Sequence, residues 1–122
     1  MTYAERSRQV ALDSSIAVMV LLNDDNSDLE FLRVRPVNGS KVIGPEEFSR
    51  RKMRCVGVVG LSGCVPRVAF SEPLEPDVVN GIAAAFLSYV CTLLGDSFPR
   101  HVEAAEILEL ERLHALPDKR TN

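Results

Sequence analysis

Residues 78–94, which lie within the longest uncharged stretch of the chain, constrain its fold more than any other feature. Pro76 and Asp77 precede this stretch and Gly95 follows it, and these residue types are typical of a helix start and a helix stop. We therefore predict a helix over residues 76–94. Apolar residues are spread around nearly every side of this helix, whereas a surface helix shows one apolar stripe. Such a helix needs cover on all sides.

A membrane could also cover an apolar helix, but the sequence argues against one. The stretch is at the short limit for crossing a bilayer, and Asn80, Ser88 and Thr92 interrupt it. Its flanks carry acidic residues, whereas membrane flanks favour Lys and Arg on one side. We expect no membrane contact.

A second copy of the chain is another way to cover the helix. Small residues recur along it at spacings of three and four, which lets another backbone approach closely. The predicted dimer interface comprises Gly81, Ala84, Ala85, Leu87, Ser88 and Cys91. The alternative is that the helix is the central core helix of a monomer.

Length and composition indicate one globular domain. The chain has 122 residues, of which 46% are hydrophobic and 25% charged, and this excludes a disordered chain, a collagen and a coiled coil. Its size allows a core without metal or disulfide staples. We expect a single domain over residues 1–117 and a flexible tail over residues 118–122.

Capping and periodicity patterns predict an α/β (α+β) fold. Thr2 and Glu5 fit a capping box, which favours a helix over residues 3–12. Apolar runs bounded by turn residues predict strands over residues 15–22, 29–35, 41–43, 55–61 and 65–70, and Pro66 requires an edge or a strand start. Further helices are expected over residues 44–54 and 99–116, with the acids of the last helix on its solvated side. The order α-β-β-β-α-β-β-α-α suggests a mixed sheet of four to five strands with three to four helices.

The net charge of −3 is unevenly distributed. Residues 33–67 are strongly basic and residues 71–122 are acidic, which suits either a nucleic-acid surface or two copies that attract each other. The basic residues that could hold RNA or another phosphate are Arg33, Arg35, Arg50, Arg51, Lys52 and Arg54. Aromatic residues are only 6% of the chain, so platforms for stacking bases are scarce.

The glycine-rich segment 57–64 is the strongest candidate for an enzyme site, but it matches no catalytic motif. It lacks the Gly-Lys-Ser/Thr ending of a phosphate loop, and Cys64 stands where a nucleophile elbow around Ser62 needs glycine. His101 and His114 are too far apart to share one helix face. A small enzyme using Ser62 or Cys64 is therefore the third hypothesis, and we expect no metal and no cofactor.

The three cysteines Cys55, Cys64 and Cys91 do not form a disulfide framework, because their number is odd. Reduced thiols favour the cytoplasm or the interior of a viral particle. The sequence thus predicts a non-enzymatic protein–protein interaction module, a homodimeric assembly or adaptor factor. A phage or viral source is suggested by how common such short domains are in those genomes, and no residue bears on it. An RNA- or phosphate-binding accessory protein is the alternative.

Overall fold

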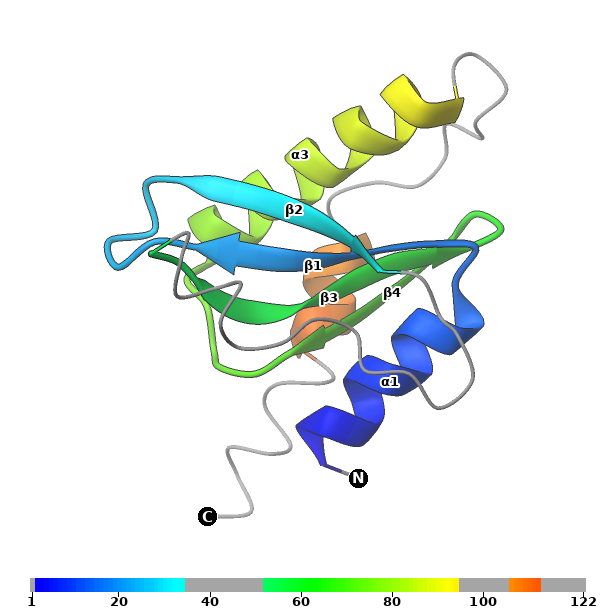
Figure 1. Ribbon diagram of the computed structural model, residues 1–122, viewed down its shortest axis with the longest axis horizontal. Coiled ribbons are helices and arrows are strands. Elements are labelled where there is room, and N and C mark those ends of the chain that lie inside the picture. The colour runs from blue at the N-terminus through cyan, green and yellow to red at the C-terminus, as the bar shows by residue number, and fades with distance from the viewer. Residues whose placement is uncertain (1, 35–51, 95–105, 113–122) are drawn as a thin grey trace.

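The computed structural model describes residues 2–34, 52–94 and 106–112 (Figure 1). In chain order its elements are α1 (Tyr3–Asp13), β1 (Ile16–Leu22), β2 (Leu29–Val34), β3 (Arg54–Ser62), β4 (Val65–Phe70) and α3 (Pro76–Leu94). Residues 106–112 are also helical. The described residues thus form a four-stranded sheet with three helices, an α+β fold.

The sheet has the strand order β2-β1-β3-β4, and each pair of neighbours is antiparallel. The prediction of a mixed sheet is therefore wrong for the described strands. Two of the three pairings are hairpins, because β1–β2 and β3–β4 are each joined by a short turn, which makes the two strands antiparallel. Strand β4 is at an edge, which confirms the position required by Pro66.

Helices cover both faces of the sheet (Figure 1). On one face α3 and Ile107 pack against alternate residues of β1, among them Val18 and Val20. On the other face Val10 and Ala11 of α1 pack against Ala17 and Met19. All seven residues of β1 are buried for this reason, which explains why its sequence is a continuous apolar run.

Aromatic rings join α3 to the sheet near the edge strand β2. The ring of Phe31 contacts the rings of Phe86 and Tyr89 edge-on, with centroid distances of 6.2 and 5.8 Å. Such edge-to-face pairs are favourable because the positive edge of one ring meets the negative face of the other. They anchor the middle of α3 over β2.

Three of the predicted helices are confirmed where the chain is described, namely α1, α3 and, over residues 106–112, the helix predicted over residues 99–116. Helix α1 begins after Thr2, whose hydroxyl accepts from the Glu5 backbone N–H while the Glu5 carboxylate accepts from the Thr2 N–H, completing the capping box. Helix α3 has the predicted bounds. The helix predicted over residues 44–54 is wrong at its end, because Lys52 is in a turn with a φ of 55° and Arg54 begins β3. The predicted strand 41–43, residues 44–51 and the predicted tail 118–122 lie outside the described residues.

The glycines of β3 and its turn have different roles. Gly63 adopts a φ of 64° in the β3–β4 turn, a conformation that favours glycine. A side chain at Gly57 would collide with Phe70 and the Ala69 carbonyl, and one at Gly60 would collide with Ser14 at the end of α1. The glycine-rich segment therefore serves a turn and close packing, as expected for glycines within a strand.

Within the described residues 106–112 of the last helix, one residue differs from expectation. Ile107 is buried as predicted, but Glu111 is buried as well. The Glu111 carboxylate accepts a hydrogen bond from the backbone N–H of Leu74. Burial raises the pKa of this carboxyl above its ordinary value. The expectation that all acids of this helix are solvated is thus corrected for Glu111.

Candidate functional site

Helix α3 has one buried face and one exposed face. Its buried residues are Val79, Ile82, Ala83, Phe86 and Val90, which recur at three- and four-residue spacings and face the sheet. The expectation of an apolar helix on all sides is therefore wrong in one respect: the bulky side chains that lie fully in the core form a single stripe.

The exposed face of α3 contains most of the predicted interface residues. Gly81, Ala84, Ser88 and Cys91 are exposed, whereas Ala85 and Leu87 are half-buried at its borders. The residues outside the core are thus mainly small, and from Val78 to Leu94 none is charged. Exposed faces of surface helices ordinarily carry charged residues, so this face is unusual. We refer to Gly81, Ala84, Ala85, Ser88 and Cys91 as the α3 outer face.

Gly81 is the most informative residue of the α3 outer face. Apart from the neighbouring backbone of the helix itself, no atom of the described residues lies within 4 Å of the position that a Cβ would take there. Glycine inside a helix costs about 0.5–1 kcal/mol relative to alanine. Packing within the described chain therefore gives no reason for a glycine at this position.

A cavity of about 360 Å³ adjoins Gly81. Its floor includes Leu22, Leu29 and Ile82, and its rim includes Asn26 and Ser27 of the β1–β2 turn. The outer face of α3 thus continues into a recess against the hairpin.

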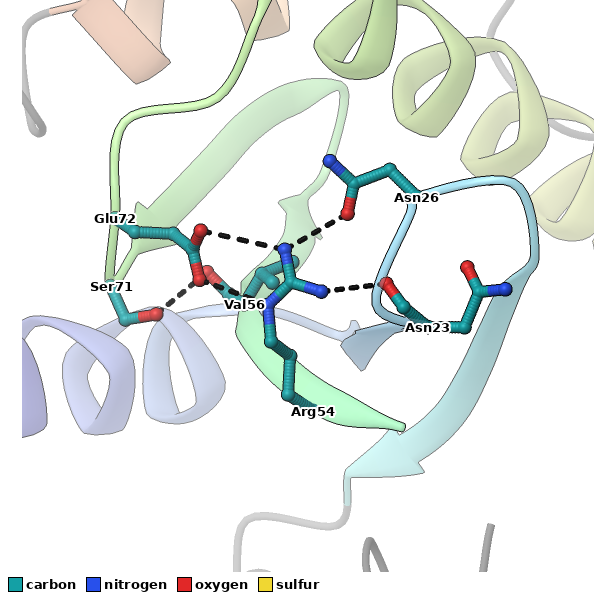
Figure 2. Close-up of polar contacts among 6 residues, drawn as sticks. All are labelled: Asn23, Asn26, Arg54, Val56, Ser71 and Glu72. Atoms are coloured by element: carbon teal, nitrogen blue, oxygen red, sulfur yellow. Dashed lines mark hydrogen bonds and ion pairs between the residues drawn. The ribbon is translucent and has the colours of Figure 1, made fainter. Parts of the chain in front are cut away.

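The β1–β2 turn that forms the rim is fixed by Arg54 (Figure 2). The Arg54 guanidinium donates to the Asn23 carbonyl oxygen at 2.6 Å and to Asn26 Oδ1 at 2.9 Å. It also pairs with the Glu72 carboxylate, at 3.2 Å from Nε to Oε1. Ser71 beside Glu72 is itself bonded to the Val56 carbonyl oxygen. Arg54 therefore ties the turn to the segment that leads into α3.

The contacts of Arg54 affect the prediction that it binds phosphate together with the other basic residues of the predicted set. Among the described members, Arg33 is exposed on β2 and Lys52 is exposed in a turn, while the charge of Arg54 is directed to Glu72 within the same chain. Arg35, Arg50 and Arg51 lie outside the described residues. Phosphate binding by this set stays a prediction, and the structure does not bring its described members together through a shared contact.

Sequence reasoning missed the Arg54 network. The partners are separated by 18 to 31 positions in the chain, so no local spacing reveals them. The only available signal was the cluster of turn-forming Asn and Asp residues after β1, which marks the turn but does not identify its ligand.

Among the described thiols, Cys55 is close to Tyr3 of α1. Burial is the main cause that raises the pKa of the Cys55 thiol, and the Tyr3 pKa is also raised, first by burial and then by the charge of Cys55. A raised thiol pKa lowers the thiolate fraction and opposes nucleophilic reactivity. Ser62 and Cys64 are half-buried, and neither lines the cavity beside Gly81. The two histidines lie outside the described residues.

The described part of the chain holds no group of three or more His, Cys, Asp or Glu side chains that could bind a metal ion. Pro76–Leu93 of α3 is long and apolar enough to cross a membrane, with a mean hydropathy of 1.3, a property that core helices of soluble proteins share. The chain matches no protein-family model, no curated protein and no solved structure.

Proposed function

We propose that the protein is a non-enzymatic interaction module that forms a homodimer through the α3 outer face. The observation that carries this proposal is that, from Val78 onward, the described exposed side of this 19-residue helix is uncharged and consists mainly of small residues, with Leu93 as a large exposed hydrophobic residue near its end. Burying such a face removes no charge from water, so association avoids the desolvation cost of charged groups.

A second copy is the partner that fits this face best. In a two-fold interface the same patch meets itself, so any charge on the patch would lie near an identical charge. The uncharged α3 outer face has no such repulsion. Gly81, Ala84 and Ser88 would let two helix axes approach closely, and the distance between packed helices depends on the side chains at the contact. The position of Gly81, unexplained within one chain, then has a reason.

The proposed biological role is that of an assembly or adaptor factor in a reducing compartment. Dimerisation would present two copies of each charged surface to further proteins. The three free cysteines support a reducing compartment, because an odd number of thiols cannot all be paired in disulfides within one chain.

A charge placed in the α3 outer face tests the proposal. Ala84→Glu introduces a charge at an exposed position, which the single chain tolerates because the side chain reaches water. We expect this variant to be monomeric, measured by multi-angle light scattering after size exclusion. Ala4→Glu is the matched control, since Ala4 is also exposed and helical but lies on α1.

The outcomes are distinct. A dimeric wild type and Ala4→Glu beside a monomeric Ala84→Glu would support the proposal. Equal masses for all three chains would overturn it, whether all are monomers or all are dimers.

A further inference from the structure

A second cavity, of about 180 Å³, lies between α1 and β4, the edge strand opposite to β2 in the sheet. Helix α1 contributes Arg6, Gln9, Val10 and Asp13, and β4 contributes Arg67 and Val68. Leu110 of the helical residues 106–112 completes the lining. We refer to this cavity as the α1–β4 cleft.

The α1–β4 cleft has an apolar interior. Val10 and Val68 are buried, with 6% and 0% of their surface exposed, and Leu110 is half-buried. Small-molecule sites combine such apolar walls with a few polar groups that orient the ligand. An engineered cavity of about 150 Å³ in another protein binds benzene, so a cleft of this size admits a guest of roughly six to eight non-hydrogen atoms.

The charged side chains that line the cleft indicate which ligand charge would be favourable there. The Arg67 side chain is exposed, and the structure shows no hydrogen bond or ion pair between it and any described residue. Arg6, which also lines the cleft, is buried and donates to the Phe70 carbonyl oxygen at 3.4 Å. Among the described lining residues the acidic group is Asp13, which accepts a hydrogen bond from Gln9 Nε2 at 2.9 Å. Arg67 is thus the cationic side chain of the described lining that an anion can pair with.

We propose that the α1–β4 cleft binds a small aliphatic carboxylate, whose chain contacts Val10, Val68 and Leu110 while its carboxylate pairs with Arg67. The planar guanidinium suits a carboxylate because it can donate two parallel hydrogen bonds. This site is separate from the α3 outer face and does not depend on dimerisation.

Hexanoate, hexan-1-ol and hexylamine are suitable probes, because they share a six-carbon chain and differ in charge. Each is titrated into the full-length ¹⁵N-labelled protein, and amide shifts are followed by NMR. For hexanoate we expect saturable shifts at Gln9, Val10 and Val68 with a Kd on the order of millimolar, as for other small ligands of modest contact area. Shortening the acid by one methylene should weaken binding about fourfold, from the transfer free energy of a buried methylene.

Two variants make the test specific, because one removes a positive charge from the cleft and the other removes a negative charge. Arg67→Gln should raise the Kd for hexanoate about two- to fivefold, and Asp13→Asn should lower it by a similar factor, as expected for exposed charge pairs. The same variants should act in the opposite sense on hexylamine and leave hexan-1-ol unchanged. Arg8→Gln is the control, since Arg8 is exposed on α1 but does not line the cleft.

Three results would overturn the proposal. The first is the absence of saturable shifts with hexanoate in the wild type. The second is equal binding of the three probes, and the third is an equal effect of Arg67→Gln and Arg8→Gln. Either of the last two would show that charge in the cleft does not select the ligand. Thermal melts of the variants confirm that each retains the fold.

Discussion

Arg54 shows how one side chain can organise a turn and a loop. Its guanidinium satisfies a backbone carbonyl, an amide oxygen and a carboxylate from two segments that are far apart in the sequence. Hydrogen bonds that involve a charged group are stronger than neutral ones, but this side chain is partly exposed and water weakens the pairing.

We predict that Arg54→Ala lowers the free energy of unfolding by about 1–3 kcal/mol, because the Asn23 carbonyl and the Glu72 carboxylate lose their donor. Chemical denaturation measures this change. Arg112→Ala is the control, because among the described residues Arg112 pairs with exposed Glu109 alone, at 2.9 Å, and its loss should cost less than about 0.5 kcal/mol. Equal losses in the two variants would contradict a structural role for the network.

Glycine substitutions should separate open from crowded positions. We predict that Gly81→Ala stabilises the isolated chain by about 0.5–1 kcal/mol, because the helix gains an alanine and the added Cβ meets no atom. Gly60→Ala should destabilise it, since the added Cβ would collide with Ser14. Thermal unfolding at low protein concentration measures both. Destabilisation by Gly81→Ala would show that the single chain needs a glycine there.

Cysteine reactivity should follow burial. Cys91 is exposed on α3, whereas Cys55 is half-buried and its pKa is raised. We predict that iodoacetamide at neutral pH, at a protein concentration low enough to keep the chain monomeric, modifies Cys91 well before Cys55, and that the Cys55 rate rises only as pH approaches its raised pKa, because the thiolate is the nucleophile. Peptide mass spectrometry over time resolves the two sites. Faster modification of Cys55 would contradict its environment.

The helices and strands themselves were largely predictable from the sequence, because each carries a local signal. The Thr2–Glu5 capping box located α1, and Pro76 and Gly95 delimited α3. The antiparallel pairing of β1 with β3 was not predictable, because more than 30 residues separate these strands and strand order leaves no local pattern. The end of the helix predicted over residues 44–54 was wrong because the basic residues suited a helix C-terminus, but Arg54 instead serves tertiary contacts from β3.

Predicting which side of α3 faces the core required more than its composition. The spacing of Val79, Ile82, Phe86 and Val90 already contained the stripe that packs on the sheet. The small residues around this stripe obscured it in the sequence, because Ala, Gly and Cys count as apolar but contribute little apolar surface to a core. The exposed location of the predicted interface residues Gly81, Ala84 and Ser88 therefore came from the structure.

The burial of Glu111 in the helical residues 106–112 should make the stability of the fold depend on pH. The pKa of Glu111 is raised in the fold, so the folded state binds its proton more tightly than the unfolded state. This stabilising contribution is present below the ordinary Glu pKa and is lost as pH rises through the raised pKa.

Glu111→Gln should therefore stabilise the protein at pH 7 relative to the wild type, with a difference that shrinks as pH falls through the acidic range. The amide oxygen can still accept from the Leu74 N–H. Denaturant midpoints measured from pH 3 to pH 7 check this. A difference that grows toward acid would contradict the burial of Glu111, and Glu109→Gln at an exposed site of the same helix is the control.

At the scale of the whole molecule, the chain separates its core from its candidate surfaces. Helix α3 uses bulky residues to close one face of the sheet and leaves small, uncharged residues outward. The α1–β4 cleft lies at another part of the sheet and combines apolar walls with arginine. The two proposed sites therefore share no described residue.

The molar mass of the unmodified chain in solution tests the central claim most directly. Sedimentation equilibrium over a range from about one to one hundred micromolar spans the affinities of ordinary weak and moderate interfaces. We predict a mass that rises from one chain of 13.4 kDa to two chains as concentration increases. A mass that stays at one chain throughout this range would contradict it.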